Sequence, residues 1–160
     1  MTDRPSIRVA VVMEREAAPN RWEDWRFRVI EVLNDDGGFG SAARLLRDDG
    51  KTARFLHPGF EVALWKDEGE GYWLNLTSPS TVWFVMWRVA EADPSSAAPV
   101  LVTLSYNEAG RLMDAQEKVD NVPLDAPVRN WLQAFTNEHY KPEPKQRRRP
   151  ASFQRPEDRK

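Results

Sequence analysis

The stretch 82–89, VWFVMWRV, constrains the fold more than any other part of the chain. In an extended strand, Val82, Phe84 and Met86 point to one side, while Trp83 and the alternate residues after it point to the other. Both faces are therefore apolar. Such a strand is usually central in a sheet and covered by a helix or a second sheet, or else it contacts a partner. We expect the rest of the chain to pack around it.

The segment just before this strand also alternates with a period of two. Apolar residues recur at every second position in 60–65 and again in 72–77, as they do in pleated strands. The glycines of 67–71 and Pro79, between two serines, are residues that turns require. The pattern therefore predicts an antiparallel meander of three strands over 60–90.

Elsewhere, strands are predicted from β-branched residues and alternation at 7–15, 21–33, 52–57 and 100–106, with loops at 34–40, 48–51 and 91–99. Segment 41–46 fits either a helical turn or an extended piece. Segment 107–119 has two interpretations: a hairpin with its loop at 107–110, or a helix capped by Asn107. We favour the hairpin, because Gly110 would lie in the first turns of the helix.

A helix is predicted at 125–140. Asp125 can accept hydrogen bonds at the helix N-terminus, and Pro127 suits the first turn. The apolar residues follow at i, i+3, i+4 and i+7, a spacing that forms one helical stripe: Val128, Trp131, Leu132 and Phe135. This stripe should lie across the β-sheet.

These elements predict an α+β fold. A curved antiparallel sheet of six to eight strands forms a sandwich or partial barrel, with one C-terminal amphipathic helix packed on it. With 160 residues, of which 41% are hydrophobic, the chain suits a single domain over 1–140. Segment 141–160 has eight basic and three acidic residues and no apolar face, so we expect a disordered basic tail.

Composition excludes several classes of site. The chain has no cysteine, which rules out disulfides, cysteine-bound metals and cysteine nucleophiles. No apolar run approaches the ~20 residues needed to cross a bilayer, and the first residues do not form a signal peptide. We therefore expect a cytoplasmic protein without membrane insertion.

Catalytic signatures are also missing. His57 and His139 stand alone in the sequence, and we interpret both as structural or solvent-exposed. The paired carboxylates lie in polar turns, where nothing separates their pKa values as acid/base catalysis needs. Nucleotide-loop and metalloprotease motifs are absent. We predict no metal site, no cofactor and no catalytic residue, and we favour a non-enzymatic protein.

Seven tryptophans and nearby arginines allow a binding function. Most of the tryptophans should be core residues, since each buries ~150–250 Å². Those on two strands, with adjacent arginines, are candidates for protein partner binding, as are the basic residues of the tail. The candidates are Trp22, Trp25, Arg26, Arg28, Trp83, Trp87, Arg147, Arg148 and Arg149. Nucleic acid is a less suitable partner, because the remaining chain carries 15 basic and 22 acidic residues, a charge of −7 that repels phosphates.

Four segments also carry a family resemblance: VVMERE, RWEDWRFRVIEVL, LSYNEAGRLMDAQEKVDNVPL and WLQAFTNEHYKPEP. Over about Val9 to Pro144 the chain resembles a family of uncharacterised bacterial domains of unknown function. The matching positions are Glu14, Arg15, Trp22, Trp25, Tyr106, Gly110, Arg111, Asp114 and Tyr140. The resemblance implies genes located among those of molybdenum-dependent formate dehydrogenases and iron–sulfur proteins. It assigns no catalytic residue.

Together these observations predict a non-enzymatic accessory protein. It would bind a redox-enzyme component, or a companion accessory protein, during assembly, maturation or regulation of a molybdenum-dependent formate dehydrogenase. The alternative is a small-ligand domain that holds a nucleotide or pterin between tryptophan and arginine side chains.

Overall fold

The computed structural model describes residues 4–17 and 24–142. Seven strands form two antiparallel sheets with the orders β2-β1-β4-β3 and β6-β5-β7. The strands are β1 Ser6–Ala17, β2 Trp25–Asn34, β3 Arg44–Asp48, β4 Thr52–Ala63, β5 Val82–Ala90, β6 Asp93–Thr103 and β7 Lys118–Pro123. The helices are the short 3₁₀ turn η1 Lys66–Glu68, then α1 Gly69–Thr77, α2 Tyr106–Asp114 and α3 Ala126–His139.

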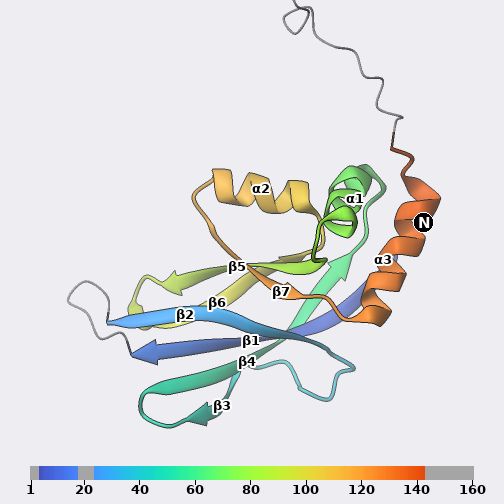
Figure 1. Cartoon of the computed structure of the whole chain (residues 1–160). Coiled ribbons are helices and arrows are strands. Elements are labelled where there is room, and N and C mark those ends of the chain that lie inside the picture. Colours follow the sequence, from blue (N-terminus) through green and yellow to red (C-terminus); the bar gives the residue numbers. More distant parts are fainter. Residues whose placement is uncertain (1–3, 18–23, 143–160) are drawn as a thin grey trace, which may run out of the picture.

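The two sheets pack face to face, and the helices pack on surfaces that the sheets do not cover (Figure 1). Helix α2 lies over the outer face of the three-stranded sheet, while α1 and α3 lie at one end of the sandwich. The predicted α+β class and the open sandwich of six to eight strands are confirmed, without a closed barrel. The expectation of one helix is wrong for the described residues, which contain three α-helices.

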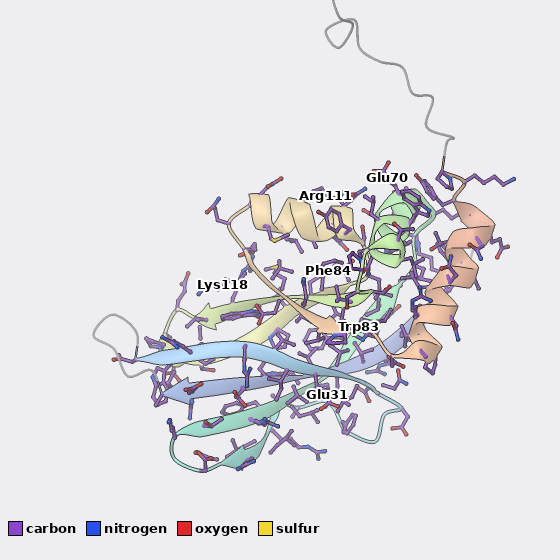
Figure 2. All side chains as sticks on the ribbon, viewed as in Figure 1. Glu31, Glu70, Trp83, Phe84, Arg111 and Lys118 are labelled. Atoms are coloured by element: carbon purple, nitrogen blue, oxygen red, sulfur yellow. The ribbon has the colours of Figure 1, made fainter. Side chains whose placement is uncertain are left out.

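Strand β5 is central in its sheet and buried on both faces, as the sequence predicts. Trp83 and Trp87 face the four-stranded sheet with only 1% and 6% of their surface exposed. Phe84 and Met86 on the other face are buried beneath α2, where the ring of Phe84 meets that of Tyr106 at 6.3 Å. Trp83 and Phe84 are labelled in Figure 2. The two apolar faces therefore serve two different layers.

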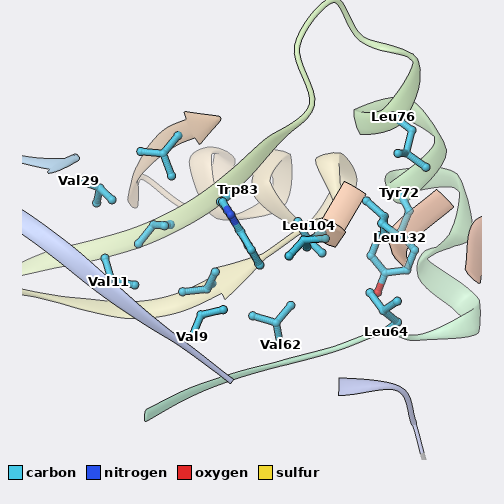
Figure 3. Close-up of a cluster of buried hydrophobic side chains, with 14 of the residues drawn as sticks. Val9, Val11, Val29, Val62, Leu64, Tyr72, Leu76, Trp83, Leu104 and Leu132 are labelled. Carbon is cyan, nitrogen blue, oxygen red and sulfur yellow. The ribbon is translucent and has the colours of Figure 1, made fainter. Parts of the chain in front are cut away.

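The main core lies between the sheets and continues under the helices (Figure 3). Trp83 is surrounded there by Val9, Val62 and Leu104. Burying a large aromatic ring contributes several kcal/mol, on the order of the 3–5 kcal/mol that its removal costs. The core therefore depends on Trp83 more than on any neighbouring valine.

The predicted strand at 72–77 is wrong, because this segment belongs to α1. Tyr72 and Leu76 lie one turn apart on its buried face, so the same residues also fit the helical period. The preceding glycines provide close packing rather than a turn. A Cβ at Gly71 would overlap the Ser105 hydroxyl, and one at Gly69 would lie 2.8 Å from Tyr140 Cβ. The predicted three-stranded meander is therefore also wrong, because α1 replaces its middle strand and the flanking strands β4 and β5 belong to different sheets.

The hairpin predicted at 107–119 is also wrong, because Tyr106–Asp114 forms α2. Ser105 is its N-cap, and its Oγ accepts a hydrogen bond from the Glu108 N–H at 3.1 Å. Gly110 has open space around its Cα and is accommodated inside the helix. The alternative prediction of a helix is confirmed, although its N-cap is Ser105, two residues before the predicted Asn107.

Strand β6 begins where a loop was expected at 91–99, and this prediction is wrong. The loop was expected because the segment consists of polar and small residues; it also contains Pro94 and Pro99, which cannot donate to a sheet. However, β6 is an edge strand of its sheet, where a missing N–H is tolerated on the open side. The other predicted strands are present, and the open segment 41–46 contributes to the edge strand β3.

The predicted strands 52–57 and 60–65 form one strand, β4, and Pro58-Gly59 between them is a bulge. Gly59 has a φ of 86°, a conformation that glycine adopts without strain. The buried carboxylate of Asp35 accepts hydrogen bonds from the N–H groups of Gly59 and Gly37, both at 2.9 Å. These two bonds lower the pKa of Asp35 and tie the β2–β3 loop to the bulge.

Helix α3 confirms the predicted C-terminal helix. Asp125 is its N-cap residue by backbone conformation, but its carboxylate makes no capping hydrogen bond. Val128, Leu132 and Phe135 are buried against the core, whereas Trp131 is half-buried. The helices in the described part of the chain are all too short or too polar to cross a bilayer. Of the predicted tail, residues from 143 onward lie outside the described part.

Candidate functional site

A groove lies at the end of the sandwich where β2 begins and β5 ends. Its volume is about 570 Å³. It is lined by Asp24, Trp25, Arg26, Phe27, Trp87, Val89, Pro94 and Lys118, and we call it the Trp25 groove. Three of the residues predicted for partner binding, Trp25, Arg26 and Trp87, therefore meet in one concave surface.

Trp25 is half-buried and held by a cation. The guanidinium of Arg15 lies 4.5 Å from the Trp25 ring centroid and 5.4 Å from that of Phe55. One of its terminal nitrogens donates to the Ser95 carbonyl at 2.8 Å, which links β1 to β6. Because Arg15 is fixed by three contacts, it positions Trp25 at the groove.

Trp87 forms the deeper part of the same groove. Its ring meets Phe27 at 6.0 Å with an interplanar angle of 56°. Lys118, opposite Trp87 in the β5–β7 pair, places its ammonium 5.0 Å from the ring centroid. The Nε1–H groups of Trp87 and Trp83 are both buried without a partner among the described residues. Trp83 lies in the core and does not line the groove.

The arginines predicted together are not equivalent. Arg28 lies on the outer face of the four-stranded sheet, where its Nε and Nη2 bind Glu14 at 2.9 and 2.8 Å. Arg54 binds the other Glu14 oxygen at 3.1 Å, so this carboxylate, only 5% exposed, joins three strands. Arg28 therefore has a structural partner, and the Trp25 groove does not include it.

A smaller cavity of about 290 Å³ adjoins the groove and shares Phe27 with it. Arg15 and His57 both line it, and Nε of Arg15 and Nε2 of His57 are buried without a hydrogen-bond partner among the described residues. Burial lowers the pKa of His57 below its usual 6.5, which favours the neutral imidazole. Asp93 at the rim is bound by the Ser95 hydroxyl and N–H, and these bonds lower the pKa of its carboxyl.

The other predicted site residues, Trp22, Arg147, Arg148 and Arg149, lie outside the described residues. Sequence reasoning missed Lys118 and Arg15 as site residues. Lys118 was missed because its position opposite Trp87 depends on the pairing of β7 with β5. The hairpin predicted at 107–119 would pair Lys118 with another strand. Arg15 follows an apolar run on β1 and could have been suspected, since a cation on an inward-facing position needs a partner.

The groove offers aromatic surface and positive charge, a combination suited to binding. Within residues 4–17 and 24–142, no group of three or more His, Cys, Asp or Glu side chains is arranged to hold a metal ion. His57 has no partner on its Nε2 that would orient it as a base. Aromatic rings beside cations are groups that can recognise a partner or a ligand.

Two other positions of the resemblance, Arg111 and Tyr140, support the fold. Arg111 pairs with Glu68, which also accepts a hydrogen bond from the Ser105 hydroxyl at 2.6 Å. These contacts join η1 to α2. The Tyr140 ring lies 6.1 Å from that of Trp73 and closes the α1–α3 contact. These residues position the helices, as Glu14 positions the strands.

Comparison with known proteins shows which family the chain belongs to. The family described as a protein of unknown function, DUF3305, matches residues 8–149. No curated protein and no solved structure is similar to the chain. The matched range includes every described strand and helix, with β1 from its third residue onward. The chain therefore belongs to the DUF3305 family of proteins of unknown function.

Proposed function

We propose that this protein is a non-enzymatic accessory protein that binds a protein partner through the Trp25 groove. The observation that carries the proposal is the convergence of Trp25, Trp87 and Lys118 in one concave surface. Tryptophan and arginine are enriched among the residues that dominate binding energy at interfaces. Here Arg15 and Arg26 stand beside them.

The groove also has the properties of a prepared surface. Arg15 is held between two rings and tied to β6, so Trp25 loses little further freedom when a partner binds. Lys118, beside the Trp87 ring, favours a partner segment that combines an apolar or aromatic side chain with a carboxylate. In this proposal the basic residues Arg147–Arg149 add a second contact to an acidic surface of the same partner.

The proposed partner is a component of a molybdenum-dependent formate dehydrogenase, or a companion accessory protein acting in its assembly, maturation or regulation. This part of the proposal rests on the gene neighbourhood that the family resemblance of the chain implies. It is independent of the groove geometry, so partner identity and binding surface are tested separately.

The experiment is binding of the full chain to purified formate dehydrogenase subunits, measured by biolayer interferometry. Trp25→Ala should weaken binding by about tenfold or more, as at an interface hot spot. Lys118→Glu should weaken it through charge reversal. Trp65→Ala, at the other end of the sandwich, is the matched control and should bind as the wild type does.

Two results would count against the proposal in different ways. If no formate dehydrogenase subunit binds the wild-type chain, the partner assignment fails. If a subunit binds equally well to wild type and Trp25→Ala, the partner stands and the groove is excluded as its contact.

A second candidate function is binding of a nucleotide or pterin in the same groove. The pairing of Arg15 with Trp25, and of Lys118 with Trp87, favours it, because planar anionic ligands use both ring stacking and cations. The groove volume of about 570 Å³ suits such a ligand. A rise in Tm with guanosine monophosphate or pterin-6-carboxylate that disappears in Trp25→Ala would support this function over protein binding.

A further inference from the structure

A second concave surface lies at the opposite end of β1, where β4 passes into η1. It has a volume of about 530 Å³, within the range of small-molecule sites. We call it the Trp65 pocket, and it is lined by Arg4, Pro5, Leu64, Trp65, Lys66, Asp67, Phe135 and His139. Pro5 directly precedes β1, whereas Arg15, which contacts Trp25, is near the end of that strand, so the two sites are separate.

Trp65 is 44% exposed, in contrast to the buried tryptophans of β5. Its backbone is nevertheless fixed. The Trp65 N–H donates to the buried Tyr72 hydroxyl at 2.9 Å, and the N–H of the preceding Leu64 donates to the Pro5 carbonyl at 2.8 Å. The indole is therefore attached to a rigid backbone and forms a pre-positioned aromatic surface.

A cation covers part of this surface. The Arg4 guanidinium lies 3.7 Å from the Trp65 ring centroid, in the geometry of a cation–π contact. Lys66 is also in the lining. Within the described residues, no carboxylate is within ion-pair distance of Arg4 or Lys66. The pocket therefore has two cations against one lining carboxylate, Asp67.

Helix α3 supplies the remaining aromatic residues. Phe135 and His139, one turn apart, have ring centroids separated by 4.5 Å. Phe135 is buried, and the His139 side chain is 23% exposed. Leu64 adds an apolar surface with 1% exposure. The aromatic lining thus comes from Trp65 and from α3, which are distant in sequence. The two cations, Arg4 and Lys66, lie on the Trp65 side.

We propose that the Trp65 pocket binds a small planar aromatic anion. The ring of such a ligand would lie between Trp65 and the Phe135–His139 pair, and its carboxylate, sulfonate or phosphate would bind Arg4 and Lys66. A neutral aromatic molecule would use the rings alone, and a simple inorganic anion would use the cations alone. Only a ligand with both features uses the whole pocket.

The test uses two fluorescent probes of similar shape with the full chain. One is 8-anilino-1-naphthalenesulfonate, and the other is N-phenyl-1-naphthylamine, which lacks the sulfonate. Arg4→Gln and Lys66→Gln should each weaken binding of the sulfonate probe by about fivefold and affect the neutral probe much less, because only the sulfonate pairs with these cations. Trp65→Ala should weaken both probes. Arg129→Gln, which removes an exposed charge of α3 outside the pocket lining, is the matched control and should change neither. Trp25→Ala reports any probe that binds in the Trp25 groove.

Circular dichroism establishes that each variant is folded before titration. If Trp65→Ala misfolds, the two surface charge variants carry the test alone. Wild-type affinity for the sulfonate probe in Arg4→Gln and Lys66→Gln would overturn the proposal. An equal loss in Trp25→Ala would also overturn it, because the probe would then occupy the Trp25 groove. The outcome is independent of protein partner binding, which is measured with formate dehydrogenase subunits.

Discussion

The middle and the two ends of the sandwich use tryptophan in different ways. In the middle, Trp83 is 1% exposed and its indole N–H has no hydrogen-bond partner among the described residues. At the ends, Trp25 and Trp65 keep part of their surface exposed, and each is covered by an arginine. An arginine stacked on an exposed ring shields apolar area and adds charge, whereas a core ring contributes only burial.

This difference shows where binding can occur. A tryptophan-rich strand is not a binding surface when its rings fill the space between two layers, as in most of β5. A single exposed tryptophan on a rigid backbone, with a cation beside it, is a better candidate. The Trp25 groove and the Trp65 pocket both have this combination, and the following four predictions test the contrast.

The largest effect is expected in the middle. Trp83→Ala should lower the free energy of unfolding by about 3–5 kcal/mol, because it leaves a cavity between the sheets. Trp65→Ala should cost less than about 1 kcal/mol, since its ring is partly exposed and loses mainly one cation–π contact. Urea unfolding followed by far-UV circular dichroism measures both. Similar costs for the two variants would contradict the contrast.

A second prediction concerns how the helical end is fastened to the strands. Asn75 of α1 is 1% exposed, and its amide donates to the carbonyls of Val82 and Leu104 and accepts from the Val82 N–H. Asn75→Ala removes one buried and two partly buried hydrogen bonds to the backbone and should cost about 2–4 kcal/mol in urea unfolding. Asn107→Ala removes one exposed bond to Glu70 and is the control, expected to cost less than about 1 kcal/mol.

A third prediction concerns pH, through His57 beside the Trp25 groove. Burial lowers its pKa below 6.5, so below about pH 6.5 the unfolded state binds more protons than the folded state. The contribution of His57 to stability is complete above this pH and declines as the pH falls toward the lowered pKa. His57→Gln should therefore show a shallower loss of stability between about pH 7 and pH 5.5, measured by urea unfolding. An unchanged slope would show that His57 titrates as it does in the unfolded chain.

The smallest effect is spectroscopic. Trp65→Phe should reduce the fraction of fluorescence that acrylamide quenches, because it removes an exposed indole. Trp83→Phe should leave the intensity of the quenchable emission unchanged and remove only protected emission, since Trp83 is inaccessible. Stern–Volmer plots of the two variants give the comparison. A larger decrease for Trp83→Phe would place the accessible surface in the middle.

The predictable part of the fold comes from long, consistent patterns. The β-branched run of β1, the two apolar faces of β5 and the apolar stripe of α3 each extend over enough residues to select one element type. The α1 segment does not, because six residues can fit both a strand and a helix. Its glycines look like turn residues in sequence, and only the closeness of Ser105 and Tyr140 explains them.

The candidate sites were only partly predictable for a similar reason. Trp25 and Arg26 are adjacent in sequence, so their grouping was visible. Lys118 reaches Trp87 through the register of β5 and β7, which depends on tertiary pairing. Trp65 and Arg4 were not singled out, because they meet only where the residues before β1 pass beside the end of β4.

The sheet edges have a consequence for how another chain can attach. A bulge interrupts β3 between Leu45 and Arg47, and two prolines interrupt the row of N–H donors on β6. On β2, the Val29 N–H is occupied by the Asp120 carboxylate at 2.9 Å. A foreign strand therefore meets interruptions on these three edges, while β7 is the fourth edge strand. A partner that contacts the interrupted edges binds mainly through side chains, which discriminate among sequences, whereas backbone pairing accepts many strands.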